Sequence, residues 1–383
     1  MVKIGSGLSL ASEVFPDRDQ EKAHSEKIDR YSAAKRHQKS ISAYILSNAP
    51  TLCKEYEALR NCGSFLLFRH YFQIGQYRLT GGCSCKKHLL CALCALRRSA
   101  RLVKEMEQKV RHVMARHSHL VPVLITKTVK NGPDLAERYN HLFQAHKRLI
   151  EKRRNSLKGR RTNTVLSLVH GAFGSIEFKR GSGSGQWHPH PHEIALVDWP
   201  RLVKKAGGEN PLRWFSHKLA EEWQELTSDS FIVDARRIDL GTEETFFKGL
   251  CEACKYALKM NELSHEDQVQ AYKVLAGRRL VYTFGSLRGI VEPVSLHDDI
   301  EDEIALQPYI EMMYHFSGVR YRLERMSYIS EQLVMEESYH KQEKTRSKRN
   351  SRLVRTAGFT LQDIKEWTDH VDLPSTYDPS TPF

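Results

Sequence analysis

The sequence predicts an α+β protein built around an antiparallel sheet. Residues 120–129 and 230–238 resemble strands in their apolar and β-branched content, and residues 175–179 alternate apolar with polar positions. The Gly-Ser connector 181–185 joins this last segment to a strand candidate at 187–197, which favours an antiparallel hairpin. Segments with helical periodicity lie between the strand candidates, so we expect helices to pack against the sheet.

Length and charge limit the class of protein. The 383 residues suffice for two or three domains, and 59 basic against 46 acidic residues give a net charge of +13, which favours a polyanionic partner. No apolar run approaches the roughly 18 residues of a membrane span. The first residues are too few and too polar for a secretory signal. We therefore expect a cytoplasmic protein with no membrane partner.

Changes in composition along the chain predict four regions. An N-terminal helical region covers residues 1–60, and a Cys-rich module with a basic helix covers residues 61–117. The strand candidates fall in a main domain at 118–290. A C-terminal helical region with a charged, flexible tail is expected for 291–383.

The chain has eight cysteines, and in a reducing compartment these favour metal binding over disulfides. Cys91 and Cys94 have the Cys-x-x-Cys spacing of a zinc knuckle, and Cys85 is favoured as the third ligand of a tetrahedral Zn²⁺ site. A thioredoxin-like redox pair is less favoured, because further cysteines lie nearby and no βαβ pattern does. The fourth ligand is left open between Cys62 and Cys83, with His88 as a weaker substitute.

Basic residues follow the knuckle along a predicted helix that ends near residue 116. Their face is a candidate for contacts with DNA phosphates, and a solvated helix face is an equally good interpretation of any one of them. The candidate DNA-binding residues are Arg97, Arg98 and Arg101 on this helix, with Lys127 and Lys130 at the end of the first strand candidate.

Residues 187–192, Trp-His-Pro-His-Pro-His, are the segment around which the site is predicted. Alternate side chains of a strand share a face, so His188, His190 and His192 are expected to lie together, where imidazoles can bind one cation. In the predicted hairpin, Glu177 could face the same side. Proline has no N–H to donate, so the two prolines suit an edge strand or the first residues of a strand. The alternative is a solvated His-Pro loop.

A predicted helix at residues 245–261 contains a second group of reactive side chains. Glu252 and Tyr256 are four residues apart and therefore share a helical face, which Lys255 and Lys259 flank. A tyrosine taken alone is more often a packing or surface residue than a nucleophile.

Together these groups suit cleavage of a DNA phosphodiester by a tyrosine. The free phenol has a pKa of roughly 10 and needs assistance to attack. A metal held by the histidines can polarise the phosphate, and Lys255 and Lys259 can stabilise the phenolate. The product is a 5′-phosphotyrosyl link with a free 3′-hydroxyl, so the strand can be rejoined later. Glu252 is placed to act as general base when the strand is released.

The chain resembles the rolling-circle plasmid replication initiators, a branch of the HUH endonucleases. Residues 123–131, 187–194 and 251–259 are similar to the family's first-strand, metal and nucleophile motifs, in the family's order. The cysteine cluster is also similar to the N-terminal part of this group. Two departures are Pro191, between two histidines, and Glu193, where the family usually has an apolar residue.

The resemblance implies a site-specific, metal-dependent DNA nicking and closing enzyme. It implies a central antiparallel sheet of the HUH nuclease type with packed helices, beside an N-terminal helical and zinc-binding module. The catalytic metal would be Mg²⁺ or Mn²⁺. Because magnesium prefers oxygen ligands, Glu177 is the candidate third ligand and His188 its rival. The partners would be single-stranded or supercoiled plasmid origin DNA and a host helicase, and an oligomer is compatible with the resemblance.

Two other classes of protein compete with this hypothesis. A non-enzymatic, zinc-containing DNA-binding regulator explains the charge and the cysteines, but it leaves the histidine strand and the Glu252–Tyr256 pair as coincidences. Another HUH enzyme, a single-strand transposase or a relaxase, is the second alternative. The order of the motifs argues against a relaxase, and the cysteine cluster and first-strand motif argue against a transposase.

Overall fold

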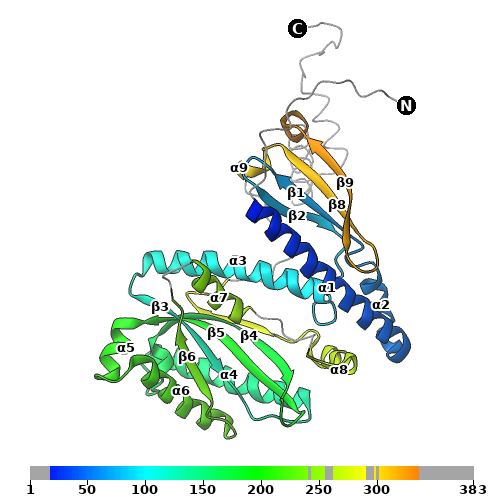
Figure 1. Cartoon of the computed structure of the whole chain (residues 1–383). Coiled ribbons are helices and arrows are strands. Elements are labelled where there is room, and N and C mark those ends of the chain that lie inside the picture. The colour runs from blue at the N-terminus through cyan, green and yellow to red at the C-terminus, as the bar shows by residue number, and fades with distance from the viewer. Residues whose placement is uncertain (1–17, 240–242, 255–261, 290–296, 299–301, 336–383) are drawn as a thin grey trace, which may run out of the picture.

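The structure is a computed structural model that describes residues 18–239, 243–254, 262–289, 297–298 and 302–335. Within these residues the chain forms two antiparallel sheets, of five and four strands, with helices packed against them (Figure 1). The predicted α+β class is therefore confirmed. None of the helices described is long and apolar enough to cross a membrane.

The five-stranded sheet has strands β3 (Leu120–Lys127), β4 (Val169–Arg180), β5 (Trp187–Asp198), β6 (Val233–Arg237) and β7 (Val281–Gly285). Its helices are α3 (Ala92–Arg116), α4 (Leu135–Leu157), α5 (Trp199–Ala206), α6 (Pro211–Thr227), α7 (Glu243–Ala253) and α8 (His265–Leu275), with the short η2 (Val165–Leu168). The strand order is β6-β3-β5-β4-β7, and neighbouring strands are antiparallel.

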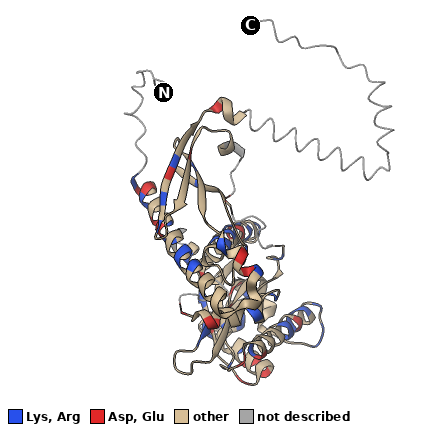
Figure 2. Ribbon diagram, turned by 90° about the vertical axis from the view of Figure 1, so that its right-hand side faces the viewer, with Lys and Arg blue, Asp and Glu red and all other residues tan. Residues whose placement is uncertain are grey.

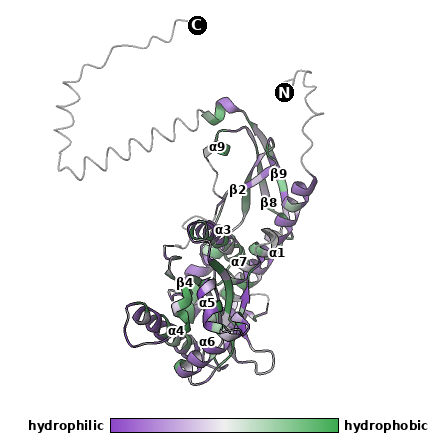
Figure 3. Ribbon diagram, turned by 90° about the vertical axis from the view of Figure 1, so that its left-hand side faces the viewer, coloured by the Kyte–Doolittle hydropathy of each residue, from purple (hydrophilic) through white to green (hydrophobic). Residues whose placement is uncertain are grey.

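Both faces of this sheet are buried, which explains the apolar run in β5. Ala195 and Val197 belong to a core shared with α4, α5, α6 and α8, whereas Ile194 and Leu196 belong to a core shared with α3 and α7. Figure 3 shows hydrophobic ribbon in this sheet near β4, with hydrophilic stretches on the helices around it. The sheet therefore has an α4 face and an α7 face, and alternate residues of β4 and β5 point to one or the other.

Two prolines lie within β5, although β5 is an inner strand of the sheet. Pro189 and Pro191 are paired with β4, but the ladder between β5 and β3 extends only from His192 to Asp198. The prolines therefore fall in the part of β5 that has one ladder neighbour instead of two. A missing backbone donor is tolerated there as it is in an edge strand.

The four-stranded sheet joins two distant parts of the sequence. Its order is β2-β1-β8-β9, and the long helix α1 packs on it through Tyr31, which shares a core with Phe68 and Tyr314 (Figure 1). The elements of this half are α1 (Arg18–Asn48), η1 (Pro50–Leu52), α2 (Cys53–Arg60), β1 (Phe65–Tyr71), β2 (Gln76–Gly82), α9 (Asp302–Ala305), β8 (Tyr309–Phe316) and β9 (Tyr321–Ile329).

The prediction of a helical region after residue 290 is wrong for residues 309–329, which contain the strands β8 and β9. Most side chains of β9 are exposed, and a register shift between Met313 and Tyr314 of β8 interrupts the alternation. A local pattern could not reveal these strands, because β8 is defined by pairing with β1, which is distant in sequence, and β9 joins the sheet only through β8. One sheet thus unites the predicted Cys-rich and C-terminal regions, and the proposed domain boundaries stay predictions.

Asp298 connects the two halves of the molecule. Its carboxylate accepts hydrogen bonds from Arg97 of α3 at 2.8 Å and from the backbone N–H of Leu79 in β2 at 2.7 Å, and Lys27 of α1 lies at 3.5 Å. Burial alone would raise the pKa of Asp298, but the charges of Arg97 and Lys27 outweigh it and lower the pKa to about 2.

We predict that Asp298→Asn lowers the free energy of unfolding by about 2 kcal/mol at pH 7, the equivalent of this pKa shift. Because the pKa of Asp298 is depressed in the folded state, its stabilisation of the fold is fully present above the unfolded-state pKa of about 4. The stabilisation is lost as the pH falls toward the folded-state pKa of about 2. Urea unfolding of both proteins across this range measures the difference. Glu324→Gln, at an exposed position of β9, is the control, and equal stability of Asp298→Asn and wild type at pH 7 would contradict the assignment.

Candidate active site and metal centres

The β4–β5 hairpin brings Glu177, His190 and His192 together on the α7 face of the sheet. Glu177 is paired with His190 across the hairpin. Its Oε2 lies 3.6 Å from Nε2 of His190 and 3.2 Å from Nε2 of His192, and all three side chains are buried. Cation ligands at right angles with bonds of about 2.1 Å are about 3.0 Å apart. The group is therefore close to the geometry of three neighbouring ligands of one divalent cation.

The other ring nitrogen of each histidine is held by an oxygen atom. Nδ1 of His192 lies 3.1 Å from Oγ1 of Thr126 in β3, and Nδ1 of His190 lies 3.3 Å from the backbone carbonyl of His188. Such contacts set the tautomer and orientation of metal-binding imidazoles. Both rings can therefore offer Nε2 to a cation. Thr126 is a contributor that the spacing of the histidines did not indicate, because it comes from a neighbouring strand.

Glu177 is the negative centre of this group. Burial alone would raise its pKa, but hydrogen bonds and charge from His190 and His192 hold the pKa well below its ordinary value. A buried carboxylate between two imidazoles is a donor set of one oxygen and two nitrogens. It suits Mn²⁺ and neighbouring transition metals, and it gives Mg²⁺ the oxygen ligand that imidazoles alone would not supply.

His188 lies outside the group that could hold a metal. Its Nδ1 is 2.6 Å from Oδ1 of Asn131, in the loop between β3 and α4. Burial, followed by the positive charges of His190 and Lys179, lowers the pKa of His188 to about 4. The structure thus favours Glu177 over His188 as the third member of the site, while the metal-binding role of all these residues stays a prediction.

Glu193 points to the opposite, α4 face of β5. It is completely buried, accepts a hydrogen bond from Nζ of Lys127 at 2.9 Å, and accepts another from the hydroxyl of Tyr282 at 3.0 Å. Glu193 is therefore a buried ion-pair residue, which accounts for a carboxylate where the resembled family has an apolar residue. Lys127 is also fully buried, so in this structure it forms a buried pair within the domain instead of the predicted surface contact with DNA.

Helix α7 ends next to the metal triad. Oγ of Ser175 on β4 donates a hydrogen bond of 2.7 Å to the backbone carbonyl of Ala253, the last residue of α7. Ser175 is paired with His192 in the sheet. Glu252 is half-buried on the same last turn. The predicted nucleophile Tyr256 and its neighbours Lys255 and Lys259 lie outside the residues that the structure describes.

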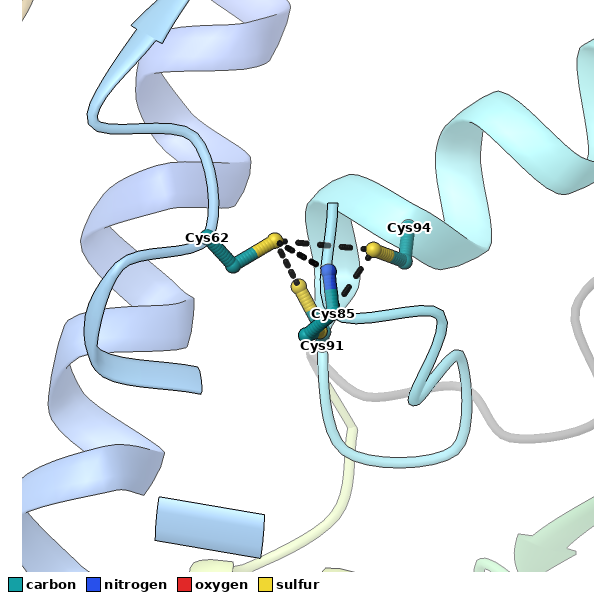
Figure 4. A group of neighbouring side chains, drawn as sticks. All are labelled: Cys62, Cys85, Cys91 and Cys94. Carbon is teal, nitrogen blue, oxygen red and sulfur yellow. Dashed lines mark hydrogen bonds between the residues drawn. The ribbon is translucent and has the colours of Figure 1, made fainter. Parts of the chain in front are cut away.

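A second group consists of four cysteine sulfurs between α1 and α3. Figure 4 shows Cys62, Cys85, Cys91 and Cys94 converging from a loop after α2, the segment before α3 and the first turn of α3. The Sγ distances are 3.6 Å for Cys62–Cys91 and 3.5 Å for both Cys62–Cys94 and Cys85–Cys94. Sulfurs around tetrahedral Zn²⁺ with bonds of 2.3 Å are about 3.8 Å apart. The four thiols therefore fit a structural zinc ion.

Of the two candidates for the fourth ligand, Cys62 is the one whose sulfur lies with the other three. Its backbone N–H bonds to Leu59 at the end of α2, and its carbonyl accepts a hydrogen bond from Lys35 of α1, so helix packing positions this sulfur. Cys83 is exposed, and neither it nor His88 belongs to the cluster. The backbone N–H of Cys91 closes a turn onto Lys87 at 2.8 Å, and this turn brings the sequence-close cysteines together.

Hydrogen bonds from Cys62, Cys85 and Cys91 lower the pKa of Cys94, whereas the neighbouring thiols and burial raise the pKa of Cys85 and Cys91. Cys94 lies in the first turn of α3, where the helix dipole also favours a thiolate. Zinc binds cysteines as thiolates, so binding of the ion would release the protons of the other thiols.

The basic residues at the start of α3 do not form the exposed surface predicted for them. Arg97, Arg98 and Arg101 are all buried, and Arg97 bonds to Tyr31 and Asp298. The interpretation of this turn as a phosphate-binding face is therefore corrected, because all three side chains are buried and Arg97 joins α3 to α1 and Asp298. Lys130 remains exposed. Lys and Arg residues are distributed over both halves of the molecule (Figure 2).

The chain matches a known protein family. Residues 76–329 match the family described as Replication protein. The chain belongs to this family. The match spans β2 to β9, so it includes the histidine strand, α7 and most of the four-stranded sheet. The resemblance to rolling-circle plasmid replication initiators is thereby confirmed.

Two relatives of this replication protein both carry the name Protein rep. One, from a Bacillus species, is 23% identical over 292 residues, which cover 68% of this chain and 87% of that protein. The other, from Streptococcus pneumoniae serotype 2, is 26% identical over 219 residues, which cover 55% of this chain and 62% of that protein. No solved structure matches the chain significantly.

We predict that Cys62→Ser reduces the zinc content of the purified protein from about one ion per chain to well below one, because the site loses a quarter of its thiolates. Cys83→Ser, which removes an exposed cysteine outside the cluster, should retain the full content. Elemental analysis of both variants provides the measurement. Equal zinc content in the two variants would show that Cys62 is not a ligand.

Proposed function

We propose that this chain initiates plasmid rolling-circle replication by nicking one strand at the origin, with Tyr256 as the nucleophile. The observation that carries the proposal is the bond between Ser175 and Ala253, because it fixes the end of α7 beside His192. Tyr256 comes three residues after Ala253, and three residues of chain span at most about 11 Å. The tyrosine is therefore tethered within reach of the metal triad.

The chemistry follows from these positions. The Tyr256 oxygen bonds to phosphorus while the bond from phosphorus to the 3′ oxygen breaks, and that oxygen leaves with the electron pair and takes up a proton. The phenol proton passes to solvent or a nearby base, and Lys255 and Lys259 favour the phenolate. A divalent cation on Glu177, His190 and His192 would supply positive charge to the scissile phosphate when bound.

The phosphotyrosyl link must later be broken. Glu252 lies one residue before Ala253 on the last described turn of α7, so we assign it the general-base role in activating water or an incoming 3′-hydroxyl. Attack by a 3′-hydroxyl rejoins the strand, and attack by water releases it. Origin DNA is the substrate that this replication protein would recognise, in single-stranded or supercoiled form.

The alternative of a non-enzymatic, zinc-containing DNA-binding regulator has weaker support. It would account for the net charge and the four thiols, but it assigns no role to a buried carboxylate held between two imidazoles. The family match to replication proteins also disfavours a transposase.

We predict that Tyr256→Phe abolishes covalent attachment to a labelled single strand that contains the origin, because the substitution removes only the attacking oxygen. Binding of the same strand should change less than about twofold. Denaturing electrophoresis detects the covalent product, and Tyr328→Phe in β9 is the matched control. An adduct formed by Tyr256→Phe would exclude Tyr256 as the nucleophile.

We predict that Glu177→Ala weakens Mn²⁺ binding by at least tenfold, because it removes the carboxylate of the triad and leaves the two imidazoles. Electron paramagnetic resonance of free Mn²⁺ measures binding independently of nicking, and a parallel nicking assay should need more Mn²⁺. Glu209→Gln, at an exposed position outside the triad, is the control. Unchanged Mn²⁺ affinity in Glu177→Ala would refute the site.

A further inference from the structure

A cleft of about 590 Å³ opens at the free end of the β4–β5 hairpin, beside the metal triad. Its walls are the loop 128–131 after β3, the hairpin tip 179–184, His188, the loop 229–232 before β6, and Glu262. We propose that this cleft binds nucleotides of single-stranded DNA next to the scissile phosphate, with Phe231 as a stacking surface for one base. The proposal rests on the proposed function for the place of cleavage, but strand binding can be measured without cleavage.

Phe231 is an exposed aromatic side chain on an ordered loop. Phe231 is 64% exposed and its neighbour Ile232 is 59% exposed. The loop is fixed to the domain on both sides. Oγ1 of Thr227 donates a 2.9 Å hydrogen bond to the carbonyl of Ser230, and the N–H of Thr128 donates to the carbonyl of Ile232 at 3.2 Å. A preorganised aromatic surface loses little entropy when a base stacks on it.

The wall of the cleft that contains Asn131 and His188 adjoins the metal triad. Nδ2 of Asn131 donates a hydrogen bond of 3.0 Å to Ser184 in the hairpin tip, and Oδ1 of Asn131 lies 2.6 Å from Nδ1 of His188. The His188 ring is centred 5.0 Å from the His190 ring. A strand whose phosphate lies at the triad therefore has the cleft directly beside it, and His188 belongs to the cleft wall instead of the metal site.

The charges that face the cleft suit a phosphate backbone. Lys130 and Lys179 line it, and neither has an ion pair with another residue in the described part of the chain. Two carboxylates, Asp229 and Glu262, also line the cleft, and Arg138 at 2.8 Å offsets the charge of Asp229. Arg180 is a structural residue that stacks on Trp187 and pairs with Asp267, so it is not assigned to DNA.

These features favour a single strand over a duplex. Bases of a duplex are stacked on one another, whereas an unpaired base can turn out and stack on an aromatic side chain. An exposed phenyl ring with two nearby ammonium groups matches the combination of stacking surface and positive groove in proteins that bind single strands.

The test uses the full-length protein with Tyr256→Phe, so that no covalent product forms. Fluorescence anisotropy measures its affinity for a short labelled single strand of mixed sequence and for the same strand annealed to its complement. We expect Phe231→Ala to weaken single-strand binding about tenfold, and Phe231→Trp to restore it. Tyr328→Ala is the matched control, because Tyr328 is an aromatic residue 61% exposed on the other sheet.

Lys130→Ala combined with Lys179→Ala should reduce the slope of log affinity against log salt by about 1.4, because each phosphate contact to a single strand contributes about 0.7. The proposal would be overturned if Phe231→Ala bound the single strand with an affinity within twofold of wild type. It would also be overturned if Phe231→Ala weakened duplex binding as much as single-strand binding. Melting temperatures of the variants verify folding. A covalent adduct that persists in Tyr256→Phe would instead count against the proposed nucleophile and leave these binding results intact.

Discussion

The register of β4 against β5 is the constraint on which the candidate active site depends. It places Glu177 opposite His190 and Ser175 opposite His192, so one ladder positions both the carboxylate of the triad and the anchor of α7. A shift of one residue would turn Glu177 to the α4 face and remove it from the imidazoles. The hairpin connector and the two cores that bury both faces oppose such a shift, because every apolar side chain would also change sides.

The same alternation separates two buried carboxylates with different partners. Glu177 faces α7 with two imidazoles, whereas Glu193 faces α4 with an ammonium group at 2.9 Å. A carboxylate that already has a lysine partner has little left to offer a cation, and removal of one member of such a buried pair generally costs about 3–5 kcal/mol. Glu193 therefore stabilises the fold of the strand, and Glu177 is the carboxylate available for chemistry.

Local patterns in the sequence predicted the strand that carries the site, because alternation is a local property. They placed His190, His192 and Glu177 on one face, and the structure brings those three together. They also grouped His188 with them, but Asn131 from another loop engages that ring. Contacts of this kind come from tertiary packing, which also explains why the choice of Cys62 over Cys83 and the pairing of β8 with β1 could not be read from spacing.

The zinc cluster and the metal triad are linked by α3 and the elements packed on it. Cys94 lies in the first turn of α3, and further along the same helix Leu102 and Met106 belong to the core that contains α7. Arg97 of this helix also holds Asp298 and thereby the four-stranded sheet. A structural zinc ion at the beginning of α3 would thus fix the helix against which α7 packs. It would contribute to the position of the nucleophile by stabilising this scaffold, with no part in the reaction itself.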